Sequence, residues 1–504
     1  MTKILRALTN KIFIVAMLIL IQFVLVIQFA RQIIFTYNFI YVLMMVLSTL
    51  LVVVVVNRDE NPSYALAWSV VILVFPPLGA VIYLIIGGRR APKLLRERIS
   101  DTFGEDNLVQ DDTIMKELKA ISKRIQRQTQ YIINGSDYPV FRNRNARYLK
   151  SGEIKFEVML QEIEKAERFI FLEYFIIKDG YMWQTLLELL KKKVNQGVDV
   201  RLIYDDWGCA TFTDLQKQCR DAGIDVVTFN PIVPKLAIQM NNRSHRKACI
   251  VDGRSGIVGG LNLADEYINK IERFGHWKDT AVFFEGEAVH ALTSMFLQFY
   301  QYYTGIKEDP ENYRYHFEEK ETKGYIQAFS DAPTDEYDLG LASHLNLINN
   351  ATEYIYIQTP YLIVGYEMIQ ALKNAATSGV DVRIIVPGVP DKVMVNQVTK
   401  SNYESLIKGG VKVYEYTPGF VHSKTMVADD KICTVGTTNM DFRSYYLHFE
   451  STVVFVDNDV VMDCKQDALD TFEVSKLITL EDVYKTPYLA RLLRGFMNIF
   501  SGLL

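Results

Sequence analysis

The chain has little cysteine: its 504 residues contain five, widely spaced and without a Cys-x-x-Cys pair. That pattern argues against a disulfide framework or a zinc knuckle and favours a reducing compartment. The net charge of −4 lacks the basic excess typical of nucleic-acid binding, so no nucleic-acid partner is expected. No Gly-x-x-x-x-Gly-Lys loop occurs, so no nucleotide cofactor is expected. The hydrophobic content of 49% excludes a disordered chain.

Long apolar runs are present, and all of them lie near the N-terminus. Ile12–Ala30, Phe39–Val56 and Tyr64–Ile86 contain 19, 18 and 23 residues without a charge. Because about 20 helical residues cross a bilayer core, each run is long enough to span a membrane. A buried core helix is the alternative for one such run, and a cleaved signal peptide is the alternative for the first. We predict a membrane anchor over residues 1–88, with two or three hydrophobic segments.

The third run carries Pro76-Pro77 at its centre, so it is expected to be kinked, broken or re-entrant. Five basic residues follow between positions 89 and 98, and positive flanks favour the cytoplasmic side. We therefore expect a multi-pass membrane protein whose chain beyond the anchor lies on the cytoplasmic side. Residues 89–137 are charged and helix-prone, and we interpret them as a connector.

An internal repeat follows the connector. Residues 166–173 resemble residues 351–358, and residues 197–203 nearly duplicate residues 379–385, in the same order. In both copies apolar strand patterns alternate with helical patterns, which is typical of βαβ units and a largely parallel sheet. Chance similarity between two βαβ units is the alternative. We predict a duplicated α/β protein with halves at residues 138–310 and 311–504.

Each half contains the same spaced set of polar residues. The interval from His to Lys is two, from His to Asp seven, and from His to Asn seventeen in both copies. A single His-x-Lys would be an ordinary solvated strand face, but two copies with matching intervals indicate a site. The residues are His245, Lys247, Asp252, Gly260 and Asn262 in the first half, and His422, Lys424, Asp429, Thr437 and Asn439 in the second.

This set suits chemistry on a phosphodiester. Residues two apart on a strand share a face, so each strand presents an imidazole and an ammonium to one pocket. One His can attack phosphorus to form a phospho-histidine while the other protonates the leaving alcohol. The lysines and amides can hold the phosphate oxygens. We predict phosphate contacts from Asn262, Asn439, Gly260 and Thr437.

Each histidine also needs a carboxylate to orient it. Asp279 lies 34 residues after His245, and Glu450 lies 28 residues after His422, so we predict that these two orient the histidines. Asp252 and Asp429 belong to the catalytic motif, although we expect them to shape the turn after the strand. No metal is expected, because the remaining histidines show no ligand spacing: His276, His290, His316, His344 and His448.

These paired motifs resemble the phospholipase D superfamily, and within it the chain is similar to the bacterial cardiolipin synthases. Supporting stretches are residues 75–80, 172–176, 260–267, 277–279 and 439–444. The resemblance implies two phospholipase D-like halves of mixed sheets flanked by helices, related by a pseudo-twofold axis. It implies transfer of a phosphatidyl group between two phosphatidylglycerol molecules, giving cardiolipin and glycerol without a cofactor. By resemblance, His245 is the nucleophile and His422 the acid and base, with membrane phospholipids as partners.

Alternatives to the transferase are a hydrolase with the same site, either a phospholipase D or a nuclease, and an inactive membrane scaffold. The departures from the superfamily pattern are Gly260 and Thr437, where many members have Ser. Two segments are expected near lipid: the apolar loop at residues 231–240 and the C-terminal stretch Tyr488–Leu504, which has amphipathic helical spacing. For both, packing against the chain's own domain is the alternative.

Overall fold

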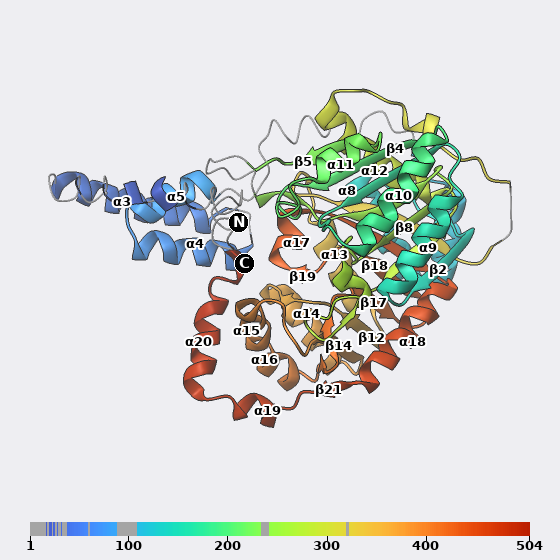
Figure 1. Cartoon of the computed structure of the whole chain (residues 1–504). Helices are drawn as coiled ribbons and strands as arrows, with labels where there is room; N and C mark the ends of the chain where they lie inside the picture. The colour runs from blue at the N-terminus through green and yellow to red at the C-terminus, as the bar shows by residue number, and fades with distance from the viewer. Residues whose placement is uncertain are drawn as a thin grey trace.

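The second and third N-terminal apolar runs form helices in the computed structural model, which describes residues 38–58, 61–87, 108–232, 241–318 and 322–503 and scattered positions from 17 to 32. α3 (Asn38–Val56), α4 (Pro62–Val74) and α5 (Leu78–Ile86) project from the α/β body (Figure 1). The third run thus breaks at its prolines, as predicted. The first run and residues 89–107 lie largely outside the described residues. Within the described part of the chain, no helix combines the length and apolarity needed to cross a membrane.

The first half of the repeat forms a seven-stranded sheet in the order β2-β10-β8-β7-β3-β4-β5. Only β3, β4 and β5 run parallel, and the remaining pairs are antiparallel. The expectation of a largely parallel sheet is therefore wrong, because β7, β8 and β10 form a meander rather than crossovers. The strands are β2 (Asn145–Leu149), β3 (Phe169–Tyr174), β4 (Asp199–Asp205), β5 (Asp225–Phe229), β7 (Lys247–Val251), β8 (Ser255–Gly259) and β10 (Ala281–Glu285).

The second half repeats this arrangement in a ten-stranded sheet, with β12, β14 and β15 parallel and the other pairs along the sheet antiparallel. Its order is β1-β11-β20-β18-β17-β12-β14-β15-β21, and β6 also pairs with β20. The strands are β1 (Phe141–Arg142), β6 (Arg243–Ser244), β11 (Tyr325–Asp331), β12 (Tyr354–Gln358), β14 (Asp381–Pro387), β15 (Lys412–Tyr416), β17 (Thr425–Ala428), β18 (Ile432–Gly436), β20 (His448–Val456) and β21 (Ser475–Leu477).

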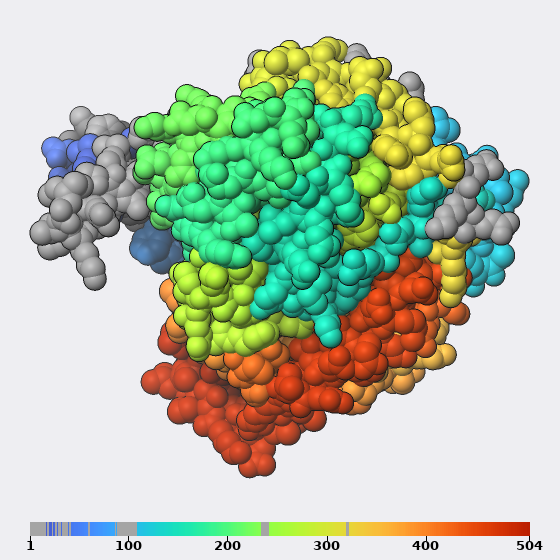
Figure 2. Space-filling view, turned by 45° about the vertical axis from the view of Figure 1, so that its right-hand side comes forward, coloured from blue at the N-terminus to red at the C-terminus, as the bar shows by residue number. Residues whose placement is uncertain are grey.

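Two equivalent helices join the halves. α12 (Ala288–Thr304) contacts five strands of the first sheet and β11 of the second, and α18 (Asp459–Glu473) contacts β2 of the first sheet and six strands of the second. Phe296 of α12 stacks on Phe171 of β3 with 4.5 Å between ring centroids. The two halves thus share buried apolar surface and pack as one body, seen as adjoining green and red regions in Figure 2.

Outer helices cover the other faces of the sheets. They are α9 (Gly152–Glu164), α10 (Tyr181–Asn195) and α11 (Leu215–Asp221) in the first half, and α13 (Leu339–Asn350), α14 (Tyr366–Thr377), α15 (Val393–Ser401) and α16 (Tyr403–Lys408) in the second. The connector helices α7 (Asp112–Ile121) and α8 (Lys123–Ser136) precede β1, and α8 contacts α13 and β11.

Short strands are exchanged between the halves. β6 runs parallel to the start of β20, which places His448 opposite Arg243 and Phe449 opposite Ser244. In the equivalent place, β9 (His276–Lys278) runs parallel to β16 (Gly419–Val421), with Trp277 opposite Phe420. Each exchanged pair lies directly before a motif histidine, so each half helps to position the histidine of the other.

The C-terminal helix α20 (Tyr488–Asn498) packs on α15 and reaches back to the N-terminal helices. Arg494 donates a hydrogen bond of 2.7 Å to Gln397, and Arg491 lies 3.5 Å from Glu404. Ser501–Leu503 continue as a short 3-10 turn against α4. The arginines of α20 therefore face its own domain, whereas its apolar side chains are exposed: Leu489, Leu492, Leu493 and Phe496.

Candidate active site

The two motif histidines occupy equivalent places immediately before β7 and β17. The backbone N–H of His245 donates to the carbonyl of Phe449 at 2.9 Å, and that of His422 donates to the carbonyl of Lys278 at 2.6 Å. Both side chains are buried, with 7% of each residue exposed. Burial is the largest cause of the lowered pKa of His245, and the positive charges of Lys247, Lys424 and His422 lower it further, so the two imidazoles are close enough to interact.

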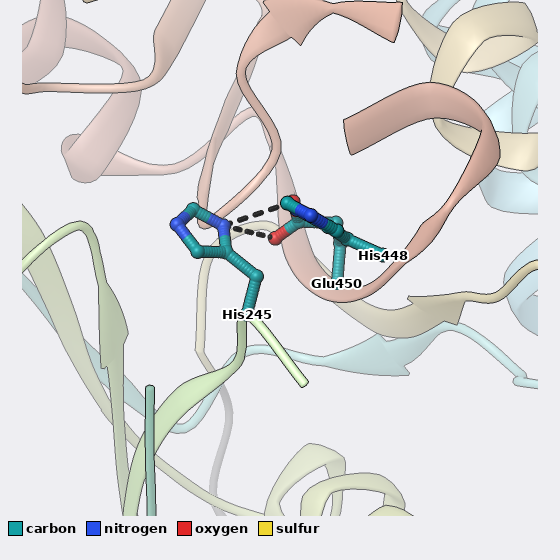
Figure 3. Close-up of side chains that lie close together, drawn as sticks. All are labelled: His245, His448 and Glu450. Atoms are coloured by element: carbon teal, nitrogen blue, oxygen red, sulfur yellow. Dashed lines mark hydrogen bonds and ion pairs between the residues drawn. The ribbon is translucent and has the colours of Figure 1, made fainter. Parts of the chain in front are cut away.

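Each histidine is held by a carboxylate from the other half. His245 Nδ1 lies 2.9 Å from both oxygens of Glu450, and His422 Nδ1 lies 2.6 Å from Asp279 Oδ2 (Figure 3 shows the first pair). Both carboxylates are fully buried. Among the described residues, none bonds the Nε2 atom of either histidine. A carboxylate at Nδ1 favours the tautomer whose Nε2 carries a lone pair, which is the atom available for attack or proton transfer.

The two lysines lie beside their histidines in the same geometry. Lys247 Nζ donates to the carbonyl of His245 and Lys424 Nζ to the carbonyl of His422, each at 2.5 Å. Burial lowers the pKa of Lys424 to about 8 and that of Lys247 well below its usual value. Glu450 and Asp279 oppose this effect by favouring the charged ammonium groups.

Burial also lowers the pKa of both histidines, but their surroundings differ. For His422, burial and Lys424 lower the pKa to about 4, whereas the charge and hydrogen bond of Asp279 raise it. For His245, the pKa falls well below its usual value. Burial is the largest cause, and the positive charges of Lys247 and Lys424 follow. A bound phosphodiester anion would raise both values, because an opposite charge nearby favours the imidazolium.

The carboxylates are supported differently at the two equivalent positions Gly260 and Thr437. A Cβ atom at Gly260 would lie 2.1 Å from Asp279 Oδ1, so the missing side chain makes room for that carboxylate. Thr437 instead donates its hydroxyl to Glu450 Oε2 at 2.5 Å, and Ser444 donates to Oε1 at 2.7 Å. The sequence analysis did not identify Ser444, which lies in residues 439–444, a stretch that resembles the family, but is not part of the repeated motif.

These contacts differ from the phosphate contacts predicted for Gly260 and Thr437. The backbone N–H of Gly260 donates to the carbonyl of Thr280 at 3.0 Å, and that of Thr437 to the carbonyl of Ser451 at 2.9 Å. With the Thr437 hydroxyl directed at Glu450, the donors of both residues already bond protein atoms. The two residues support the carboxylates that hold the histidines.

The two asparagines are buried near the histidines. Asn262 Oδ1 accepts from the backbone N–H of Ile176 at 2.9 Å, and Nδ2 donates to the hydroxyl of Tyr267 at 2.7 Å. The amide carries two N–H bonds, and Tyr267 takes one of them. Asn439 Oδ1 is buried without a hydrogen-bond partner among the described residues. Phosphate binding by these amides stays a prediction.

Asp252 and Asp429 follow their strands at the end away from the histidines, both with positive φ. Asp252 accepts hydrogen bonds of 2.8–2.9 Å from the backbone N–H groups of Glu167, Arg168 and Phe169. Asp429 accepts equivalent bonds from residues 352–354. These contacts tie the turn to the neighbouring strand, the role expected from the place of the two aspartates after it, and their assignment to the catalytic residues stays a prediction.

A third histidine that the sequence did not indicate lies beside His245. The ring centroids of His245 and His448 are 5.5 Å apart, and His448 Nδ1 lies 3.8 Å from Glu450 Oε1. Within the described part of the chain, His245, His448 and Glu450 are the one group whose ligand atoms converge enough to hold a metal ion. Spacing along the chain does not reveal this group, because 203 residues separate the two histidines.

Comparison with known proteins places this site in a family. The family described as "Cardiolipin synthase, PLD-like domain" matches residues 159–291 and 344–470, and "Phospholipase_D-nuclease N-terminal" matches residues 46–88. The chain belongs to the cardiolipin synthase family of the phospholipase D superfamily. As a member of that family, it is a phosphatidyltransferase.

Relatives of this cardiolipin synthase family member cover most of its length. An uncharacterized protein of Streptococcus mutans is 39% identical over 90% of this chain and 99% of its own. Cardiolipin synthase of Geobacillus kaustophilus is 32% identical over 91% and 92% of the two chains, and cardiolipin synthase 2 of Staphylococcus epidermidis is 32% identical over 89% and 93%.

The fold also has a solved neighbour. A phosphatidylserine synthase of Haemophilus influenzae superposes with a TM-score of 0.56 at 15% identity, covering 75% of this chain and 99% of that one. This similarity supports the phospholipase D-like fold that the family match indicates.

Proposed function

We propose that the enzyme transfers a phosphatidyl group from one phosphatidylglycerol to another, forming cardiolipin and releasing glycerol. The observation that carries the proposal is the pair of buried histidines, each held at Nδ1 by a carboxylate and each leaving Nε2 available. Two such groups can serve a two-step exchange of one phosphodiester for another. Such an exchange needs no activated nucleotide.

In the first step, the Nε2 lone pair of one histidine attacks the phosphorus of the donor lipid. The bond from phosphorus to the glycerol headgroup oxygen breaks, and the other histidine gives that oxygen its Nε2 proton. A covalent phosphatidyl-histidine and free glycerol result. In the second step, the now neutral histidine takes the proton of the acceptor's hydroxyl, whose oxygen attacks phosphorus and releases the first histidine.

The surroundings of the two histidines favour His245 as the nucleophile. Lys247, Lys424 and His422 all oppose a positive charge on His245, so its lone pair stays available for attack. His422 has the shorter carboxylate contact, 2.6 Å to Asp279, which favours its charged form. A histidine that alternates between neutral and charged forms suits the acid and base role.

The buried lysines supply the charge that a phosphodiester needs. Each ammonium group donates to the backbone carbonyl of its own histidine, and the two lysines are close enough for the charge of Lys424 to lower the pKa of Lys247 further, after burial. There they can stabilise the negative charge that develops on the phosphate oxygens during displacement, with strength increased by the low dielectric. We assign the remaining amide N–H bonds of Asn262 and Asn439 to the same oxygens.

We also propose that residues 1–88 hold the enzyme in the bacterial cell membrane, with the catalytic halves on the cytoplasmic side. The exposed surface of α3 is almost entirely apolar, which suits lipid rather than water. Its exposed side chains include Val42, Leu43, Val46, Leu47, Leu50, Val53 and Val54. In this proposal residues 89–137 connect the anchor to halves at residues 138–310 and 311–504.

The test uses detergent-solubilised enzyme, phosphatidylglycerol as the sole lipid, a chelator and no nucleotide. Mass spectrometry would follow the lipids while glycerol is assayed separately. We expect cardiolipin and glycerol in equal amounts. Phosphatidic acid without cardiolipin would make water the acceptor and overturn the transferase proposal, and a His422→Ala variant as active as wild type would overturn the proposed site.

A further inference from the structure

His448 has no role in the proposed reaction, yet it reaches the carboxylate that holds the nucleophile. It lies two residues before Glu450 on β20, so the two side chains share a face of the strand. Its side chain is 11% exposed, close to the 9% of His245. Its Nδ1 atom is buried and has no hydrogen-bond partner among the described residues, although it lies 3.8 Å from Glu450 Oε1. In Figure 3 the His448 ring lies by the Glu450 carboxylate, and both stand to one side of His245.

We propose that His245, Glu450 and His448 form a binding site for Zn²⁺ and that zinc bound there inhibits the enzyme. One ring nitrogen of each histidine and a Glu450 oxygen all lie within 4.8 Å of one another, and both Nδ1 atoms lie near that carboxylate, at 2.9 Å for His245 and 3.8 Å for His448. Zn²⁺ binds imidazole nitrogen and carboxylate oxygen at about 2.0–2.2 Å, and sites with three protein ligands leave a fourth position for water.

Inhibition follows from the atom that zinc would occupy, and this step rests on the proposed function. In the active form His245 carries its proton on Nδ1, where Glu450 accepts it, and Nε2 has the lone pair. Zinc takes the Nδ1 lone pair, so the ring proton moves to Nε2 through solvent. The Nε2 atom then has no lone pair with which to attack phosphorus. Glu450 leaves its hydrogen bond to His245 and becomes a metal ligand.

The chemistry of the site selects among ions. Two imidazole nitrogens and one carboxylate suit zinc, whereas Mg²⁺ and Ca²⁺ prefer oxygen ligands alone. The ammonium groups of Lys247 and Lys424 oppose a further positive charge, so we expect weaker binding than at a structural zinc site. Reversible inhibition of the enzyme by Zn²⁺, together with no inhibition by millimolar Mg²⁺, would therefore distinguish this site from general charge screening.

The equivalent position in the other half provides a comparison within the molecule. Trp277 lies two residues before Asp279, as His448 lies two residues before Glu450, and its ring centroid is 5.4 Å from that of His422. An indole offers no metal ligand. The His422–Asp279 pair therefore lacks a third donor, and we expect one zinc ion per chain in this site rather than two.

Binding is measured first, without reference to turnover. Full-length enzyme in detergent is titrated with Zn²⁺ by calorimetry, and Co²⁺ is added to a second sample as a spectroscopic probe. We expect one zinc per chain and visible Co²⁺ bands of a four-coordinate site. His448→Asn should weaken Zn²⁺ binding by more than about 10-fold, since even residues behind the ligands change affinity 10- to 100-fold. His316→Asn, which alters a histidine outside the site, is the matched control.

Inhibition is then measured as the ratio of activity with and without Zn²⁺ for each protein. We expect wild type and His316→Asn to be inhibited alike and His448→Asn to need at least about tenfold more zinc. Equal zinc affinity in wild type and His448→Asn would overturn the site. Zinc bound through His448 without any loss of activity would keep the site but overturn inhibition, and both results are independent of which lipid product the enzyme makes.

Discussion

The two halves of the active site have the same motif spacing but support their histidines by different means. His422 is held by Asp279, whose carboxylate occupies the space that a side chain at Gly260 would fill. Aromatic rings of Tyr267 and Trp277 lie against His422, with centroids 5.5 and 5.4 Å from its own. The first half therefore provides the imidazole of His422 with one short hydrogen bond and with contacts to two aromatic rings.

The other half adds polar groups beside its imidazole, although the Phe175 ring also lies against His245, with 5.2 Å between centroids. Glu450 holds His245 at 2.9 Å and itself accepts hydrogen bonds from Thr437 and Ser444, and His448 stands where Trp277 stands in the first half. The comparison shows that a duplicated site can keep its reacting atoms and still give them different properties. It also supplies the reason to assign the two histidines different roles.

The largest expected loss of activity comes from replacing either carboxylate, and an activated substrate then distinguishes the two replacements. Glu450→Gln and Asp279→Asn should each lower kcat with phosphatidylglycerol by about 10²- to 10³-fold, because the histidine loses the charge that supports its imidazolium. A nitrophenyl ester of phosphatidic acid has a leaving group that departs without a proton. Its nitrophenol burst should recover in Asp279→Asn and stay slow in Glu450→Gln.

Rapid-mixing absorbance of nitrophenol measures that burst. Equal recovery in both variants would mean that the histidines are interchangeable, contrary to the assignment of His245 as nucleophile and His422 as acid.

A smaller effect distinguishes the positions that support the carboxylates. Gly260→Ala places a Cβ atom 2.1 Å from Asp279 Oδ1, so the carboxylate must move and activity should fall about 100-fold, as in Asp279→Asn. Thr437→Ala removes one hydroxyl from Glu450 and should cost about tenfold, within the range for a hydrogen bond to a charged group. Steady-state kcat measures both, with Thr437→Ser as the control that retains the hydroxyl. A milder effect at Gly260 than at Thr437 would contradict the packing argument.

The pH dependence tests one of the buried lysines. Because burial lowers the pKa of Lys424 to about 8, the ammonium is present below that pH and lost above it. The profile of kcat/KM should therefore fall above pH 8, by about tenfold per unit. Lys424→Arg keeps its charge at all accessible pH, so its profile should decline less steeply above pH 8 than that of wild type, with Lys247 still free to lose its proton. An identical decline in wild type and Lys424→Arg would assign it to another group.

The smallest effect on activity is expected at the aspartates that end the motif strands. Asp252→Ala leaves three backbone N–H groups without their acceptor, so the free energy of unfolding should fall by about 2 kcal/mol. Asp429→Ala should behave alike, since its contacts are equivalent. Chemical denaturation measures the loss, and kcat per folded enzyme should stay within about twofold. A loss of kcat without a loss of stability would assign the aspartates to the catalytic residues.

Much of the site could be predicted from the sequence because the repeat preserves local spacing. The His-x-Lys pairs lead into a strand in both halves, with Lys247 the first residue of β7 and Lys424 the residue before β17, and residues two apart in extended backbone point the same way. The break at Pro76 and Pro77 was predictable for a similar reason, since proline acts on its own helix. These features depend on residues close together in the chain.

The exchange of carboxylates between the halves could not be predicted in this way. Each carboxylate follows the histidine of its own half, and only the pairing of β6 with β20 and of β9 with β16 brings it to the other. His448 was missed for the same reason, because its neighbours His245 and Glu450 come together only through this pairing. The support of Glu450 by Thr437 likewise depends on the register between β18 and β20.

The most direct measurement locates the covalent intermediate. His422→Asn and His245→Asn are mixed with the nitrophenyl lipid ester, quenched in base, digested and analysed by mass spectrometry. We predict one equivalent of phosphatidyl group on the peptide that contains His245 in His422→Asn, and none in His245→Asn. An adduct on the peptide that contains His422, or no adduct in either variant while wild type still makes cardiolipin, would contradict a phospho-histidine mechanism with unequal halves.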